Sequence, residues 1–423
     1  MTSPAPVHAA ENNTINIGVI GCGGRGLGAV NQALTTGNVK LVAIGDAFEE
    51  KASNAANALK RNKSFEGKIA DDVAIFSGLD NYKKVMDALN PGDVVLLTTP
   101  PAFRPLHFEY AVNRGLHIFA EKPLAVDTPG CKRLLAANKL AQEKNLKIAV
   151  GLMMRHHFRT EETIAKIHDG SIGDIVACYV YRMHSEYRPA KPPADSPAAK
   201  SLLQSQIIGF QGFPWGNGGF YTDWMIHSVD VACWARKEML PVSVEGQGGR
   251  QVIEQQNQLF DHAAYEYRFD DGVKMIVQLK HISNTFYQSG DWIFGTKGAA
   301  RIGETISEPK IYKGYKEDRK NLLWKSEAAN NNHYQEEHNR FFAAIRNDKP
   351  WNEMQRSVDA TLTCLMARMS VDSGQELSRE KAWDSTHEMA PGLDNWTFNS
   401  EAPVKPNADG TYALAKPGTT KEY

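Results

Sequence analysis

The stretch of sequence that decides the fold is residues 15–26, which read INIGVIGCGGRG. Its first six residues form a mostly apolar run, as a strand buried on both faces of a parallel sheet requires. The glycines that follow fit the pattern G-x-G-x-x-G. Gly21 would permit a tight turn, Gly23 would let the backbone approach a phosphate, and Gly26 would let a helix pack closely on the strand.

The surroundings of these glycines indicate a strand-helix-strand unit that binds a dinucleotide. Gly24 and Arg25 complete the motif where a helix is expected to begin, so that its positive end would face the phosphates. A second strand is predicted at 41–44, and Asp46 follows it, twenty residues after Gly26. Asp46 would accept hydrogen bonds from ribose hydroxyls and repel a 2′-phosphate, which favours NAD over NADP. Arg25 opposes that preference, because a guanidinium near the ribose could pair with a phosphate. A glycine turn with a purely structural role is the alternative.

Strands and helices continue to alternate through the first third of the chain. Further apolar strands are predicted at 93–98, 117–120 and 147–150, with helices near 82–89, 108–113 and 131–143. Short buried strands separated by helices assemble into a doubly wound parallel sheet. The sequence therefore predicts an α/β Rossmann domain over residues 15–150.

Beyond residue 151 the pattern changes to longer strands. They are predicted at 175–182, 242–251, 262–269, 274–281, 292–294 and 299–302, with a tight turn at 270–272. Two packing helices follow at 333–346 and 358–371. These signals predict a second, α+β domain over 151–390, built on an open, mostly antiparallel sheet. Residues 391–423 lack periodicity and are interpreted as a tail.

The composition narrows the range of partners. The 423 residues are 42% hydrophobic and 23% charged, and their formal net charge is -1. Such a chain offers no field for attracting nucleic acid or an anionic membrane, and no apolar run approaches the length of a spanning helix. Five scattered cysteines without a C-x-x-C spacing indicate buried free thiols and not a disulfide framework or a zinc site.

Residues 1–14 are polar and rich in alanine and proline, and they are interpreted as a second tail. Within them, Val7, His8 and Ala9 resemble the small-residue end of an export signal whose basic and apolar regions are missing. This pattern predicts a protein that is exported after folding, for example to a periplasm. A disordered tail on a cytoplasmic protein is the alternative.

A lysine stands where the predicted parallel sheet should bind its ligand. Glu121, Lys122 and Pro123 come directly after a strand, at its carboxyl end, and open α/β sheets bind ligands at that edge. A lysine next to a nicotinamide could handle a proton or donate a hydrogen bond. A solvated lysine with no role is the alternative.

Asp223 and His227 are four residues apart, so that on a helix they would share one face. A carboxylate beside an imidazole can orient it and raise its basicity, as a general base for a hydroxyl proton needs. The alternatives are a helix N-cap for Asp223 and a packed core position for His227. A metal site is disfavoured, because no third ligand is marked.

Three motifs in this order resemble the Gfo/Idh/MocA family, which includes glucose-fructose oxidoreductase and inositol dehydrogenase. They are the glycine motif, Glu-Lys-Pro after a strand, and Asp-x-x-x-His after Gly-Gly, and the resemblance spans residues 15–374. It implies that Lys122, Asp223 and His227 face the substrate beside the nicotinamide, and that the Lys122–Pro123 peptide is cis. It also implies that the open sheet is the contact face of a homo-oligomer, a dimer or a tetramer.

Two segments bear on how far the family pattern extends. Where many members have Pro-Asn-x-x-His after the fourth strand, this chain has residues 99–104, with Arg104 in place of the histidine. Thr99 and Glu121 are still expected beside the cofactor. Residues 151–157 resemble the family segment that joins the two domains. This resemblance implies that Arg155 lies at the border of the substrate site.

Three further residues are candidates for the substrate pocket. Tyr181 and His184 end a strand at the domain junction, and Trp215 precedes the Asp-x-x-x-His segment. Aromatic faces and polar donors suit a sugar ring, whose CH groups stack while its hydroxyls form hydrogen bonds. Structural packing is the alternative for each of them.

Together these residues predict an NAD-dependent enzyme that takes a hydride from a ring hydroxyl carbon of a sugar, glycoside or cyclitol. His227, oriented by Asp223, would accept the hydroxyl proton, while Lys122 would hydrogen-bond the same oxygen. One alternative is a glycosidase or lyase that oxidises its sugar only transiently, without net reduction of NAD. Another is a sugar-dependent regulatory protein without turnover.

Overall fold

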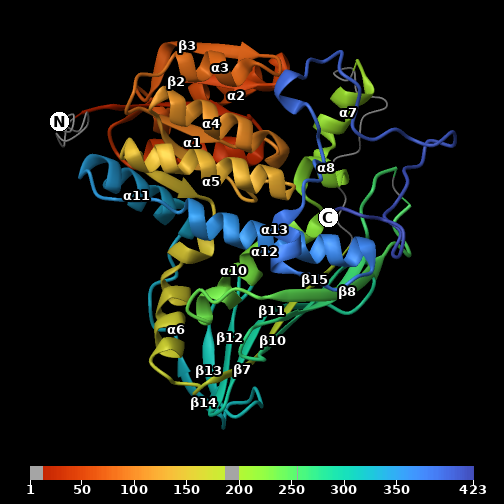
Figure 1. The fold of residues 1–423 in the computed structure, drawn as a ribbon. Helices are drawn as coiled ribbons and strands as arrows, with labels where there is room; N and C mark the ends of the chain where they lie inside the picture. Colours follow the sequence, from red (N-terminus) through yellow and green to blue (C-terminus); the bar gives the residue numbers. More distant parts are fainter. Residues whose placement is uncertain (1–12, 186–199, 255) are drawn as a thin grey trace.

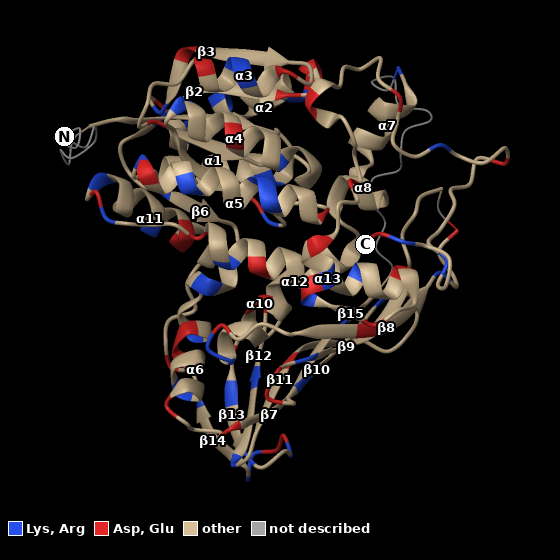
Figure 2. Ribbon diagram, in the orientation of Figure 1, with Lys and Arg blue, Asp and Glu red and all other residues tan. Residues whose placement is uncertain are grey.

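The computed structural model describes residues 13–185, 200–254 and 256–423 (Figure 1). The segment 7–9 on which the export prediction rests lies outside these residues. Within the described ranges, no helix is both long enough and apolar enough to cross a membrane. Lys and Arg residues alternate with Asp and Glu residues along the ribbon in Figure 2.

The N-terminal half is a doubly wound parallel sheet, as the sequence predicts. Its six strands follow the order β3-β2-β1-β4-β5-β6, and every neighbouring pair is parallel. The strands are β1 (Ile15–Ile20), β2 (Val39–Asp46), β3 (Ile69–Ser77), β4 (Val94–Leu97), β5 (His117–Ala120) and β6 (Ile148–Val150). The helices between them are α1 (Gly24–Thr35), α2 (Glu49–Arg61), α3 (Asn81–Asp87), α4 (Arg104–Arg114) and α5 (Thr128–Glu143). The order of strands reverses between β1 and β4, which is where such sheets bind their ligands.

The second sheet has nine strands in the order β14-β13-β12-β11-β7-β10-β9-β8-β15. All its neighbouring pairs are antiparallel except the parallel pair β7 and β10. The strands are β7 (Ile175–His184), β8 (Ser243–Gly249), β9 (His262–Arg268), β10 (Lys274–His281), β11 (Gln288–Gly295), β12 (Gly298–Ile302), β13 (Lys310–Lys313), β14 (Leu322–Lys325) and β15 (Leu377–Ser378). The open, mostly antiparallel sheet of the prediction is therefore confirmed.

Helices separate the two sheets in Figure 1. Those that follow the domain junction are α6 (Phe158–His168), α7 (Leu202–Ile208), α8 (Pro214–Asn217), α9 (Phe220–Asp223) and α10 (Ile226–Ala235). The last ones are α11 (His333–Arg346), α12 (Met354–Ser373) and α13 (Arg379–Asp384). One face of the second sheet packs on α10, where Cys178 and Val180 of β7 are fully buried. The opposite face carries the half-buried aromatic side chains of Tyr179, Tyr181 and Trp292.

The C-terminal third of the chain returns to the Rossmann half. On α11, Phe341, Phe342 and Ile345 are buried in the same apolar cluster as β1 and β2. Asn352, just before α12, forms a parallel bridge to Ile148 of β6. The Rossmann core is therefore completed by residues that the sequence assigns to the second domain.

Residues 391–423 contain no strand and only one short 3-10 helix, Leu393–Asn395, yet they are not a detached tail. Tyr412 packs edge-on against Phe213, with ring centroids 5.0 Å apart, and Ala402 is buried. Near the end, Glu422 is buried against Arg368 of α12. Figure 1 shows this segment, in dark blue, running beside α7 and α8.

Candidate active site

Two adjoining pockets lie at the carboxyl edge of the parallel sheet, where the second domain covers it. We call them the dinucleotide pocket and the catalytic pocket, and both are bordered by Thr98, Thr99 and Phe210. The dinucleotide pocket has a volume of about 110 Å³ and is lined by Gly21, Gly23, Asp46, Phe48, Lys51 and Asn81, among others. The catalytic pocket has a volume of about 280 Å³ and is lined by Arg25, Glu121, Lys122, Arg182, Asp223, Trp224, His227 and Glu304, among others.

The glycine motif builds the wall of the dinucleotide pocket. Gly21 has φ +97, and a β-carbon on it would lie 2.8 Å from the backbone of Thr98. A β-carbon on Gly26 would lie 1.9 Å from the carbonyl oxygen of Gly21, so only glycine lets α1 begin this close to β1. Gly23 and Gly24 face open space, as residues beside a phosphate should.

Asp46 ends β2 at the bottom of the same pocket and is 8% exposed. Its carboxylate accepts hydrogen bonds from the backbone N–H groups of Cys22 at 2.8 Å and Phe48 at 3.0 Å. These two bonds fix the carboxylate against the glycine loop. An ionised carboxylate accepts about four hydrogen bonds, so capacity remains for ribose hydroxyls.

Arg25 does not lie beside Asp46, and the expectation that it opposes the choice of NAD is wrong. Its Nε is 2.5 Å from Oε1 of Glu121, and its guanidinium lies over the ring of Tyr334 at 4.9 Å. These contacts place Arg25 in the catalytic pocket. The basic residue that lines the dinucleotide pocket is Lys51, which stands in no motif of the sequence.

Thr99 borders both pockets, and the buried Arg104 side chain supports its backbone. Arg104 is 1% exposed and donates to the carbonyl oxygens of Leu97 and Thr99. The Thr99 hydroxyl is 3.2 Å from Nδ1 of His107, which lies eight residues further along the chain. Arg104, which stands where the family pattern has a histidine, therefore supports the loop through two backbone carbonyls, and His107 follows it by three residues, about one helical turn.

Lys122 connects the two halves of the chain. The Lys122–Pro123 peptide is cis, as the resemblance implies. The Lys122 ammonium donates to the backbone carbonyl of Asp223 at 2.5 Å and approaches Oδ1 of the same residue at 3.2 Å. Both side chains are less than one fifth exposed. The lysine of one domain is therefore held directly by the aspartate of the other.

Asp223 and His227 do not form the predicted pair on one helix. Helix α9 ends at Asp223 and α10 begins at Ile226, and no hydrogen bond joins the two side chains within the described residues. The reason is local, because α9 is one short turn that follows Gly218 and Gly219, both at φ +81. Asp223 instead pairs with Lys122. Both residues nevertheless line the catalytic pocket.

His227 is buried and neutral. Its Nδ1 has no hydrogen-bond partner among the residues that the structure describes. Burial, followed by the field of the Lys122 ammonium, lowers the pKa of His227 to about 3. The field of Glu304 acts in the opposite direction and raises this pKa. Glu304, and not Asp223, is therefore the carboxylate that favours the imidazolium.

Arg182 and Glu304 also line the catalytic pocket, although no motif of the sequence marks them as site residues. Arg182 donates to Oε2 of Glu304 at 2.5 Å and to the carbonyl oxygen of Trp224 at 2.8 Å, and it lies over the Trp224 ring. Arg182 shares the face of β7 that packs on α10, whereas its neighbour Tyr181 points to the opposite face. The predicted segment is right, but the predicted residue is on the wrong side of the strand.

His184 does not line the catalytic pocket but contacts a residue that does. It shares the face of Arg182, and its ring meets that of Trp224 edge-on, with centroids 5.8 Å apart. Since Trp224 lines the catalytic pocket and His184 does not, His184 supports the wall and does not form it.

Arg155 and Trp215 lie away from both pockets. The Arg155 guanidinium is bound on both edges, by Asp230 and Glu238, and it lines neither pocket. Trp215 is 1% exposed and donates from Nε1 to Gln206 at 3.0 Å. Both residues stabilise packing. For Trp215 this is the alternative that the sequence leaves open, whereas for Arg155 it corrects the place at the border of the substrate site that the resemblance implies.

Each acidic side chain of the catalytic pocket has a basic partner. The pairs are Arg25 with Glu121, Lys122 with Asp223 and Arg182 with Glu304. Such a site offers many hydrogen-bond donors and acceptors with little net charge, which suits a neutral polyol. In the described part of the chain, no group of three or more His, Cys, Asp or Glu is arranged to hold a metal ion.

Comparisons with known proteins give matches to both halves of the chain. Residues 15–152 match the GFO_IDH_MocA oxidoreductase family with an NAD-binding Rossmann fold, and residues 162–301 match the C-terminal domain of that family. An inositol 2-dehydrogenase from Azotobacter vinelandii is 27% identical over 227 residues, which are 52% of this chain and 54% of that protein. A scyllo-inositol 2-dehydrogenase (NAD(+)) from Bacillus subtilis is 25% identical over 277 residues, 65% of this chain and 69% of that one. The matched region thus spans about half to two thirds of these relatives.

A solved structure shows the same fold over a longer region. It is a scyllo-inositol dehydrogenase from Lactobacillus casei with bound NAD(H) and scyllo-inositol, and it superposes with a TM-score of 0.63 at 19% identity. The superposition covers 87% of this chain and 100% of that one.

Proposed function

This chain belongs to the Gfo/Idh/MocA family of oxidoreductases, and we propose that it oxidises a ring hydroxyl of a neutral cyclitol or sugar with NAD. One observation carries the proposal. Lys122 from the Rossmann half and Asp223 and His227 from the second half meet in one pocket, which adjoins the pocket formed by the glycine motif. The inositol dehydrogenases among its relatives support a cyclitol as the first substrate to test.

The residues divide the chemistry between them. NAD, when bound, supplies the carbon that accepts the hydride. His227 accepts the hydroxyl proton, and because its Nδ1 is buried, Nε2 is the nitrogen that serves the substrate. Lys122 donates to the same oxygen and stabilises the negative charge that develops there. Asp223 holds the Lys122 ammonium in place. This role takes the place of the orientation of His227 that the sequence predicts for Asp223.

The paired charges favour an uncharged ring as the substrate. A uronate or sugar phosphate would add a negative charge to a pocket whose carboxylates already use the nearby ammonium and guanidinium groups. Removing such a charge from water without an available partner is costly. We therefore expect inositols and neutral hexoses to be better substrates than uronates.

The test is a panel of inositols, hexoses, glycosides and uronates incubated with the protein and NAD. Accumulation of reduced nicotinamide together with an oxidised ring supports the proposal. A cleaved or rearranged glycoside without net NADH would instead identify the redox-neutral glycosidase or lyase. Binding without any product would identify a sugar-dependent regulatory protein.

We also propose that a second copy of the chain covers the open face of the second sheet. Tyr179 and Tyr181 of β7 lie edge to face there, and Trp292 and Phe294 of β11 stack with ring centroids 5.8 Å apart. Tyr315, beside Phe294, is 60% exposed. A contiguous aromatic surface of this kind is typical of a protein interface.

A further inference from the structure

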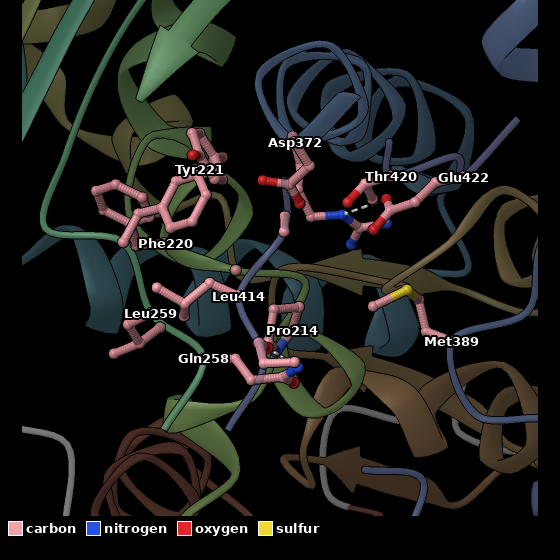
Figure 3. Close-up of a pocket in the computed structure, with 15 residues that line it drawn as sticks. Pro214, Phe220, Tyr221, Gln258, Leu259, Asp372, Met389, Leu414, Thr420 and Glu422 are labelled. Carbon is pink, nitrogen blue, oxygen red and sulfur yellow. Dashed lines mark hydrogen bonds and ion pairs between the residues drawn. The ribbon is translucent and has the colours of Figure 1, made fainter. Parts of the chain in front are cut away.

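A third cavity lies on the other side of the segment that carries Asp223. It has a volume of about 230 Å³ and lies between α9, α12 and the C-terminal segment. Figure 3 shows Tyr221, Asp372 and Glu422 around this cavity. It is separate from the catalytic pocket, with which it shares no lining residue.

Arg368 of α12 lines this cavity and is completely buried. Its Nη1 donates to the carbonyl oxygen of Val126 at 2.6 Å and to that of Gly218 at 3.3 Å. Its Nε donates to Oε2 of Glu422 at 3.1 Å. One guanidinium therefore joins three segments that are far apart in the sequence.

Two of these segments carry the catalytic residues. Val126 lies four residues after Lys122, and Gly218 lies five residues before Asp223. The first of these loops has a second attachment to α12, because the N–H of Leu124 donates to the Thr361 hydroxyl at 3.3 Å. The distance between Lys122 and Asp223 thus depends on how α12 holds the two loops.

The third segment supplies the charge that Arg368 needs. A buried guanidinium is unfavourable without a carboxylate partner, and Glu422 is that partner. Glu422 is held in turn by its neighbours, since its carbonyl accepts from the Ser385 hydroxyl at 2.7 Å. The adjacent Tyr423 ring lies 4.0 Å from the Lys381 ammonium.

We infer that Arg368, with Glu422 as its counter-ion, is a positioning residue. It fixes the loop that carries Lys122 relative to the loop that carries Asp223. The last residues of the chain are then part of the catalytic apparatus, although neither Arg368 nor Glu422 lines the catalytic pocket. This inference rests on the proposed dehydrogenase function. It predicts a defect in turnover with little change in the affinity for NAD, because neither residue lines the dinucleotide pocket.

The experiment compares the variants E422A, E422Q and R368K with wild type. For each we would measure kcat, KM, the Kd for NAD and the melting temperature. The matched control is E401Q, in the same segment, where Glu401 is 83% exposed and pairs only with Lys405 in the ion pairs of the described residues. A misplacement of catalytic groups by about 1 Å can cost roughly a hundredfold in rate, so we expect kcat of E422A to fall by about tenfold to a hundredfold.

Chemical rescue separates positioning from general stability. Loss of the Glu422 side chain in E422A leaves room beside the cavity for formate, whose carboxylate can pair with the Arg368 guanidinium. Formate should therefore restore part of the kcat of E422A and leave wild type and E401Q unchanged. R368K, which keeps the charge, should be less impaired than a neutral substitution at the same position, R368M.

The outcomes are distinguishable. Loss of kcat in E422A with an unchanged Kd for NAD and rescue by formate supports the inference, and E422Q serves the same purpose if E422A does not fold. A wild-type kcat in E422A or E422Q, with only a lower melting temperature, overturns it, as does an equal loss in E401Q. If wild type itself oxidises no member of the panel, the proposed function fails, which is a different result.

Discussion

His227 is the residue on which the proposed chemistry depends most directly. We expect H227A to lose about a hundredfold to ten-thousandfold in the rate of hydride transfer, the usual effect of removing a general base. The Kd for NAD should change little, because His227 lies in the second half of the chain and does not line the dinucleotide pocket. Single-turnover reduction of bound NAD measures this step apart from product release.

The control for this change is H387A, since His387 is exposed and away from both pockets. A wild-type rate of hydride transfer in H227A would remove His227 from the mechanism. Lys122 would then be the remaining candidate for the base, because it lies in the same pocket.

At the residue scale, we propose that Asp46 and Lys51 determine the choice of dinucleotide, because both line the dinucleotide pocket. We expect wild type to bind NAD at least about tenfold more tightly than NADP, which corresponds to about 1.4 kcal/mol. D46A should bring the two affinities close together, because Lys51 remains in the pocket as a partner for a 2′-phosphate. Titration of both dinucleotides measures the ratio, and D71A, on the exposed edge strand β3, is the control. Equal affinities in wild type would contradict the assignment of Asp46.

At the scale of elements, the sequence predicts strands and helices with clear periodicity and misses those without it. β3 is an edge strand that includes the exposed Asp71 and Asp72, so its apolar pattern is interrupted. Helix α2 buries mainly alanines, which give only a weak apolar stripe. By contrast, β4 is buried throughout and β1 at all but one position, and both strands are clear from their composition alone.

The same limit applies to the candidate site. The glycine motif, Lys122, Asp223 and His227 could be predicted because each stands in a recognisable motif. Glu304 could not, because it lies in the loop after β12 and reaches the pocket only through the folding of the second sheet. Arg155 could not be excluded either, since its two carboxylate partners lie 75 and 83 residues away in the sequence.

The contact between α12 and the C-terminal segment should make stability depend on pH. Burial, and then the negative charge of Glu422, raise the pKa of Asp372 to about 8, while Arg368 acts in the opposite direction. The folded state therefore holds a proton on Asp372 that the unfolded state loses above about pH 4. The contribution of Asp372 to stability is therefore greatest below about pH 4, and it decreases as the pH rises from about 4 to about 8.

D372N should weaken this dependence, because an amide does not ionise. Between pH 5 and pH 9 we expect wild type to lose roughly 1–3 kcal/mol more stability than D372N, measured by denaturant unfolding at each pH. D359N is the matched control, since Asp359 lies on the same helix and its carboxylate is bound by Arg379. Parallel curves for wild type and D372N would show that Asp372 is not the group responsible.

At the scale of the whole molecule, the exposed aromatic face predicts self-association. We expect Y181E and W292E to shift the protein toward the monomer, because a carboxylate buried at an interface has no partner there. Sedimentation velocity measures the assembly. I75E is the control, since Ile75 is exposed on β3 in the other sheet. A wild-type protein that is monomeric at high micromolar concentration would contradict the proposed contact face.

The return of α11 to the Rossmann core also has a consequence for synthesis on the ribosome. Phe341 and Phe342 fill the core beside β1 and β2, which are made some three hundred residues earlier. Domains usually fold in the order in which they emerge, but the first half of this chain has an unfilled apolar surface until most of the second half has left the exit tunnel. The two halves must therefore mature together, and a nascent chain that stalls between them exposes to chaperones the surface that α11 would have covered.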